Sequence, residues 1–132
     1  MSKKVESAKS GTIIVAAQVT IGASGAVTTV AAGDDAVNCA LSDTNLYTFT
    51  IASHILRGAY AIIPFFSSAI ASADTTTDTV AWIPSVKAIS VSAGTVTMRF
   101  CSDTGAADEP ASGDTINALF VIHRAPDRVG FE

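Results

Sequence analysis

The chain has 132 residues and a formal net charge of −4, with 48% hydrophobic but only 15% charged residues. This length is typical of one domain, and the negative charge argues against a nucleic-acid-binding protein. The charged fraction lies well below the roughly 25% of ordinary soluble proteins. We therefore predict that part of the surface is buried against other protein chains.

Residues 1–10 form a short polar segment that includes Lys3 and Lys4. Glu6 interrupts the positive charge, and no leucine-rich apolar run follows, so this is not a secretory signal. We expect a flexible N-terminal arm. Contact of this arm with nucleic acid or with an acidic protein surface is an alternative, but a solvated tail explains the composition more simply.

The first predicted strand, Thr12–Ile21, is apolar on both of its faces. It has about half of the 20 residues that a membrane helix needs, and its β-branched residues favour a strand. One face carries Ile13, Val15, Ala17, Val19 and Ile21, and the other carries Ile14, Ala16 and Gln18. A glycine-rich turn at Gly22–Gly25 and a second strand at Ala26–Ala31 predict a hairpin.

Seven further segments are predicted to be strands, with turn signals every 8–12 residues, and most of them show the two-residue period of a strand. They are Val37–Leu41, Leu46–Ile51, Ala59–Ser67, the short Val80–Ile83, Val86–Val91, Thr95–Cys101 and Thr115–His123. Tyr47, Phe49 and Ile51 are expected on one face, and Val96, Met98 and Phe100 point inward. Val86 is expected to share a face with Ala88 and Ser90, opposite Ile89. Pro64 indicates a bulge or an edge strand, and 68–79 and 102–114 are expected to be polar loops.

This pattern predicts an all-β protein, an antiparallel β-sandwich or jelly roll of roughly eight strands. We expect a flexible arm at 1–10, one domain at 11–124 and a C-terminal tail at 125–132 that carries Phe131. The first and last strands are apolar on both faces. They are either central strands under a second layer or a subunit contact, and we favour a contact for at least one of them.

The chemistry-bearing residues form no catalytic or metal-binding pattern. His54 and His123 show no HxH or HExxH spacing, and there is no G-x-S-x-G motif, so we expect neither an enzyme nor a cofactor. The acidic loops lack the spacing of a calcium loop, and turn chemistry explains their aspartates. Cys39 and Cys101 are expected to be free core residues, with a disulfide possible if their strands are neighbours.

The aromatic residues allow two interpretations. Trp82, Tyr60, Phe65 and Phe66 could form a face that stacks on sugars, or they could pack in the core. Each lies within an apolar strand, which favours core packing.

Five stretches carry a resemblance: they read "VTIGASGAVTT", "NLYTFTIASHI", "AYAIIPFF", "KAISVSAGTVTMRFCSDTGAADEP" and "INALFVIH". They resemble β-sandwich domains of tailed-phage virion proteins, the capsid decoration or cement proteins, head fibres and tail-fibre modules. The matching residues are Tyr47, Phe49, Ile51, Tyr60, Ile62, Val96, Met98, Phe100, Asp103 and Gly105. Leu46 replaces the glycine that usually precedes the tyrosine. The resemblance covers most of the chain and implies no catalytic residues.

The composition and the resemblance together predict a decoration protein on the capsid surface of a virion. The expected partners are copies of the chain itself, as a homotrimer, and the major capsid protein, with no nucleic acid and no membrane. The alternative is a fibre adhesin that binds a host surface glycan. The residues expected at the interface are Lys3, Lys4, Ile14, Ala16, Gln18, Leu119, Val121, His123 and Phe131.

Overall fold

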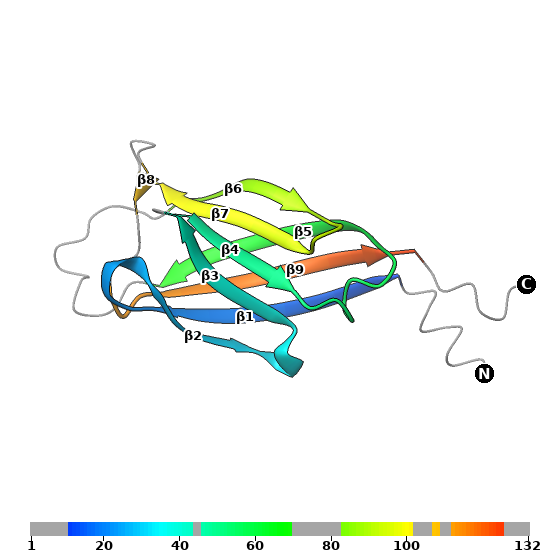
Figure 1. Cartoon of the computed structure of the whole chain (residues 1–132), viewed down its shortest axis with the longest axis horizontal. Coiled ribbons are helices and arrows are strands. Elements are labelled where there is room, and N and C mark those ends of the chain that lie inside the picture. The colour runs from blue at the N-terminus through cyan, green and yellow to red at the C-terminus, as the bar shows by residue number, and fades with distance from the viewer. Residues whose placement is uncertain (1–10, 44–45, 70–82, 102–106, 109–111, 126–132) are drawn as a thin grey trace, which may run out of the picture.

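The computed structural model describes residues 11–43, 46–69, 83–101, 107–108 and 112–125. Two antiparallel sheets pack face to face (Figure 1), which confirms the predicted antiparallel β-sandwich. Sheet A has the strand order β2–β1–β9–β5, formed by Val27–Ala32, Thr12–Ile21, Thr115–Arg124 and Ala59–Ala69. Sheet B has the order β3–β4–β7–β6, formed by Val37–Asp43, Leu46–Ile51, Thr95–Cys101 and Ile83–Ser90.

The core lies between the two sheets and is built from every second residue of the strands, as the period-two pattern predicts. On β4 and β7 the inward residues are fully or almost fully buried: they are Tyr47, Phe49, Ile51, Val96, Met98 and Phe100. Phe49 of sheet B packs against two rings of sheet A, with centroids 5.2 Å from Phe66 and 5.6 Å from Phe120. These aromatic contacts join the two sheets at the centre of the sandwich.

A buried hydrogen bond links the β1–β2 hairpin to sheet B. Its turn is a 3-10 segment, Ala23–Gly25 (η1), in which Ser24 and Gly25 both have positive φ. The Tyr47 hydroxyl, on β4, donates to the Gly25 carbonyl oxygen at 2.8 Å. A buried phenol requires such a partner, so this bond sets the position of the turn against the opposite sheet.

Two strand details differ from the sequence prediction. A β-bulge between Val86 and Ala88 makes Val86 pair with Met98 and Ile89 pair with Val96, so Val86 and Ile89 share a face. The predicted grouping of Val86 with Ala88 is therefore wrong, because one extra residue shifts the alternation. The second difference is a two-residue strand, Ala107–Asp108 (β8), which pairs with β7 inside the segment predicted as a loop.

Pro64 lies on β5, which is an edge strand of sheet A, as the proline indicated. The bulge of β5 lies elsewhere, at Tyr60, between the paired residues Ala59 and Ala61.

The first and last strands lie side by side at the centre of sheet A (Figure 1). They pair without interruption from Thr12 opposite His123 to Thr20 opposite Thr115. Their inner faces are covered by sheet B, while no described residue of this chain covers their outer faces. The explanation by a second layer therefore holds for the inner faces, and a subunit contact stays a prediction for the outer faces.

The two cysteines are free. Cys39 lies on β3 and Cys101 on β7, and β4 separates these strands in sheet B. Burial of Cys39 raises the pKa of its thiol from 9.0 to about 12, because the thiolate is poorly solvated in the core.

This raised pKa predicts a loss of stability in alkali. Between pH 9 and 12 the unfolded chain loses the Cys39 proton while the folded chain keeps it, so the free energy of unfolding falls by about 1.4 kcal/mol per pH unit. The Cys39→Ala variant has no thiol at this position, so its free energy of unfolding should not show this additional fall. Urea unfolding of both proteins from pH 8 to pH 11 measures the difference, and parallel pH profiles would contradict it.

Candidate interaction surface

The outer face of sheet A is apolar over two rows that cross β1, β9 and β5. The pairing brings Ile14 of β1, Val121 of β9 and Ile63 of β5 into one row, because each is a register partner of the next. The next row consists of Ala16, Leu119 and Phe65, in the same order. We call these six residues, together with Ala31 of β2, the sheet A face.

The large side chains of the sheet A face are exposed to solvent. The exposed fraction is 63% for Ile14, 55% for Phe65 and 38% for Leu119. Scattered apolar residues are normal on protein surfaces, but a contiguous apolar patch usually marks a contact with another molecule. The sheet A face is such a patch, since its rows are adjacent along the strands.

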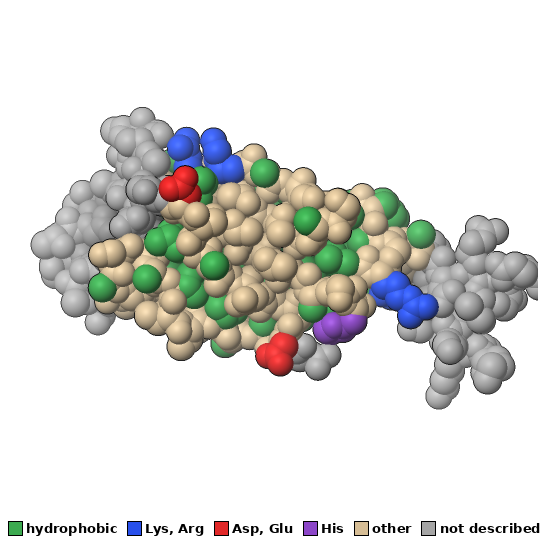
Figure 2. All heavy atoms as spheres, viewed as in Figure 1, with side chains coloured by type: hydrophobic (Ala, Val, Ile, Leu, Met, Phe, Trp, Pro, Cys, Tyr) green, Lys and Arg blue, Asp and Glu red, His purple; other side chains and the backbone are tan. Residues whose placement is uncertain are grey.

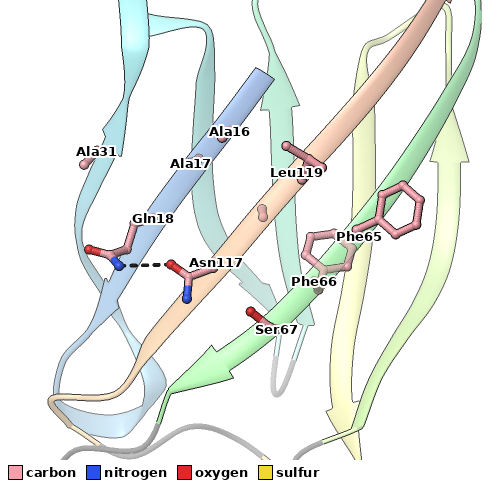
Figure 3. A pocket seen from close by; sticks show the side chains of 10 residues that line it. Ala16, Ala17, Gln18, Ala31, Phe65, Phe66, Ser67, Asn117 and Leu119 are labelled. Carbon is pink, nitrogen blue, oxygen red and sulfur yellow. Dashed lines mark hydrogen bonds between the residues drawn. The ribbon is translucent and has the colours of Figure 1, made fainter. Parts of the chain in front are cut away.

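A polar row borders one end of the sheet A face (Figure 3). Gln18, Asn117 and Ser67 are register partners across β1, β9 and β5. The Gln18 side-chain amide donates to the Asn117 side-chain oxygen at 2.9 Å. Beside this row a shallow hollow of about 480 Å³ lies between Phe65 and the small side chains of Ala16 and Ala31.

An aromatic pair borders the opposite end. The ring of Tyr60 stacks on the His123 imidazole with centroids 6.3 Å apart, and Tyr60 is 66% exposed. The Thr12 hydroxyl and His123 Nδ1 are 3.2 Å apart, within hydrogen-bond distance. The bulge at Tyr60 turns this ring toward His123, because it adds one residue to β5 opposite β9.

Charge is sparse on the sandwich. The rows of the sheet A face and its two borders contain no Asp, Glu, Lys or Arg. In the view of Figure 2, charged side chains are few and lie near the periphery of the described part. This face therefore has no charged group that a partner could recognise through opposite charge.

The outer face of sheet B is polar by contrast. Threonines from the central strands dominate it: Thr48 and Thr50 come from β4, and Thr95 and Thr97 from β7. The hydroxyls of Thr48 and Thr97 lie 3.3 Å apart and bond to each other. The two outer faces of one sandwich thus differ in kind, and only the face of sheet A resembles a protein interior.

The structure gathers most of the predicted interface residues. Six of them lie on the outer side of β1 and β9: Ile14, Ala16, Gln18, Leu119, Val121 and His123. Lys3, Lys4 and Phe131 lie outside the described residues.

Strand β5 adds Ile63, Phe65 and Tyr60 to the same surface, and none of these three was predicted at the interface. The signal was present, because Ala59–Ser67 is apolar on both faces, as β1 and β9 are. Core packing, the interpretation favoured for the aromatic residues, is confirmed for Phe66 and is wrong for Phe65 and Tyr60, which are exposed. Trp82 lies outside the described residues.

No other candidate site emerges from the described part of the chain. It contains no group of three or more His, Cys, Asp or Glu residues that could hold a metal ion. His54 is exposed in the turn between β4 and β5. Among the same residues, no helix is both long and apolar enough to cross a membrane.

Comparison with known proteins identifies no relative. No family model, no curated protein and no solved structure matches this chain.

Proposed function

We propose that this chain is a structural protein of a phage virion, a decoration protein that binds the assembled capsid and stabilises it. The observation that carries the proposal is the uncharged, apolar sheet A face, on a chain with only 15% charged residues. Such a surface is suited to permanent burial against protein. The proposed partners are copies of this chain and the major capsid protein, and the proposed location is the capsid surface.

The proposed mechanism is stabilisation by binding. A protein that binds the assembled lattice more tightly than isolated coat subunits shifts the equilibrium toward the lattice. An oligomer on a lattice symmetry axis makes several weak contacts at once, so its avidity exceeds the affinity of each contact. This mechanism requires no catalytic residue, which agrees with the absence of a catalytic motif from the sequence.

Particles with and without the protein test the proposal. Virions that carry the gene and virions from which it has been deleted are heated in parallel, and DNA release is followed with a fluorescent dye. We expect the deletion particles to release DNA at a lower temperature, and the purified protein to restore the higher one. An unrelated β-sandwich domain at equal concentration is the control. Failure of the protein to sediment with the particles would overturn the proposal.

A second candidate function has a specific observation in its favour. The exposed Phe65 lines the same hollow as Gln18 and Asn117, and a hollow that offers both an aromatic ring and amides is suited to a sugar. A fibre adhesin would use this hollow to bind a host surface glycan. Soluble protein in excess would then block infection, and Phe65→Ala would abolish the block without changing the temperature of DNA release.

A further inference from the structure

We infer that the sheet A face binds the same face of other copies of this chain, so that the protein self-associates before it meets any other partner. The inference deepens the proposed function, on which it rests for naming copies of this chain as partners, by assigning their contact to one face. It rests on the size of the face, on its lack of charge and on the polar row at its border.

The outer surface of sheet A, which holds the sheet A face together with its polar and aromatic borders, is large enough for a stable contact between copies. β1 and β9 have ten residues each, and sheet A has four strands. These dimensions correspond to an outer surface about 33 Å long and about 19 Å wide, or about 600 Å². Two such surfaces bury about 1,200 Å², which is the lower bound of standard stable interfaces. A contact of this size therefore uses the borders as well as the sheet A face.

The lack of charge favours an identical partner. In a contact between identical faces every charged side chain approaches its own copy or a residue of the same surface, so like charges repel unless they are absent. The sheet A face and its polar row carry no Asp, Glu, Lys or Arg. A partner selected by opposite charge would find nothing to pair with here.

The polar row supplies a self-complementary pair of groups. Because Gln18 donates to the Asn117 side-chain oxygen, Gln18 retains its carbonyl oxygen as an acceptor and Asn117 retains its amide as a donor. A copy brings the same acceptor and the same donor. The Asn117 amide of one copy can therefore donate to the Gln18 carbonyl oxygen of the other. Such bonds would fix the register of two apolar faces that could otherwise slide past each other.

Two closed arrangements satisfy these dimensions. Two faces can pack directly on each other at the usual sheet spacing of about 10 Å. Three faces about 19 Å wide can instead enclose a triangular prism whose axis lies about 5.5 Å from each sheet, close to half of that spacing. The second arrangement corresponds to the homotrimer expected from the sequence, and both bury the same residues.

The mass of the purified protein tests the inference without any particle. Size-exclusion chromatography with light scattering should give two or three times the 13.5 kDa of one chain. Leu119→Asp places a charge at the centre of the face, so we expect self-association to weaken at least 30-fold, as for an interface hot spot. The control is Thr50→Asp, which places the same charge on the outer face of sheet B and should leave the mass unchanged.

A second variant covers the case in which Leu119→Asp fails to fold. Phe65→Ser lies on an edge strand with a half-exposed ring, so its effect on folding of the single chain is small, and it should also weaken self-association. A wild-type monomer at 100 μM, or an oligomer that Leu119→Asp and Phe65→Ser both leave intact, would overturn the inference. Neither result bears on the particle test, so the two proposals fail separately.

Discussion

Replacement of Phe120 by Ala is expected to lower the free energy of unfolding by about 3–5 kcal/mol. Phe120 is fully buried on β9, and its ring packs 5.6 Å from Phe49 and 5.7 Å from Phe66. Ala would remove the contact between the sheets and leave a cavity that neighbouring strands cannot close. Typical domains have a total stability of about 5–15 kcal/mol, so this one change removes a large share of it.

Urea unfolding followed by circular dichroism measures the loss at Phe120. Ile83→Ala is the matched control, because Ile83 is a large apolar residue on a strand but is 48% exposed. We expect the control to lose less than about 1 kcal/mol, in line with surface substitutions. Equal losses in the two variants would mean that the aromatic cluster is not the centre of the core.

Gly94→Ala is expected to destabilise the fold by about 2–4 kcal/mol. Gly94 ends the turn between β6 and β7 with a φ of +72°, which a residue with a side chain adopts only with strain. A Cβ atom there would overlap the Leu56 side chain and approach the Ile51 carbonyl oxygen. The Gly94 carbonyl also accepts a hydrogen bond from the Ile51 amide at 2.8 Å, so the turn has little room to move.

Two other glycines distinguish the cost of backbone strain at a positive φ from the cost of steric overlap between a new Cβ and its neighbours. Gly58 has a similar φ of +75°, but a Cβ there would meet no atom closer than 3.6 Å. Gly58→Ala should therefore lose only about 1 kcal/mol, from backbone strain. Gly33 has neither a positive φ nor a close neighbour, so Gly33→Ala should be neutral or slightly stabilising. In thermal unfolding, the midpoint temperature should fall most for Gly94→Ala, less for Gly58→Ala and not at all for Gly33→Ala. A loss for Gly58→Ala as large as for Gly94→Ala would contradict the explanation by steric overlap.

The sequence was enough to predict the sandwich, because a strand with one covered face must alternate apolar and polar residues. Leu46–Ile51 and Thr95–Cys101 alternate without interruption, and their inward residues could be assigned from the pattern. Where a bulge adds a residue the pattern fails, as at Val86 and Ile89. A bulge changes the register of pairing between strands, and a single strand read alone does not contain that register.

The apolar character of both sides of Thr12–Ile21 and Thr115–His123 was also evident from the sequence, and it led to the prediction that another molecule covers the second side. Only the tertiary structure placed these strands next to each other and added Phe65 and Ile63 from β5 to the same face. Residues about 100 positions apart, such as Gln18 and Asn117, meet because long-range strand pairing is decided by the packing of the whole sandwich. Local propensity determines which segments are strands, and tertiary packing determines which of their faces lie together.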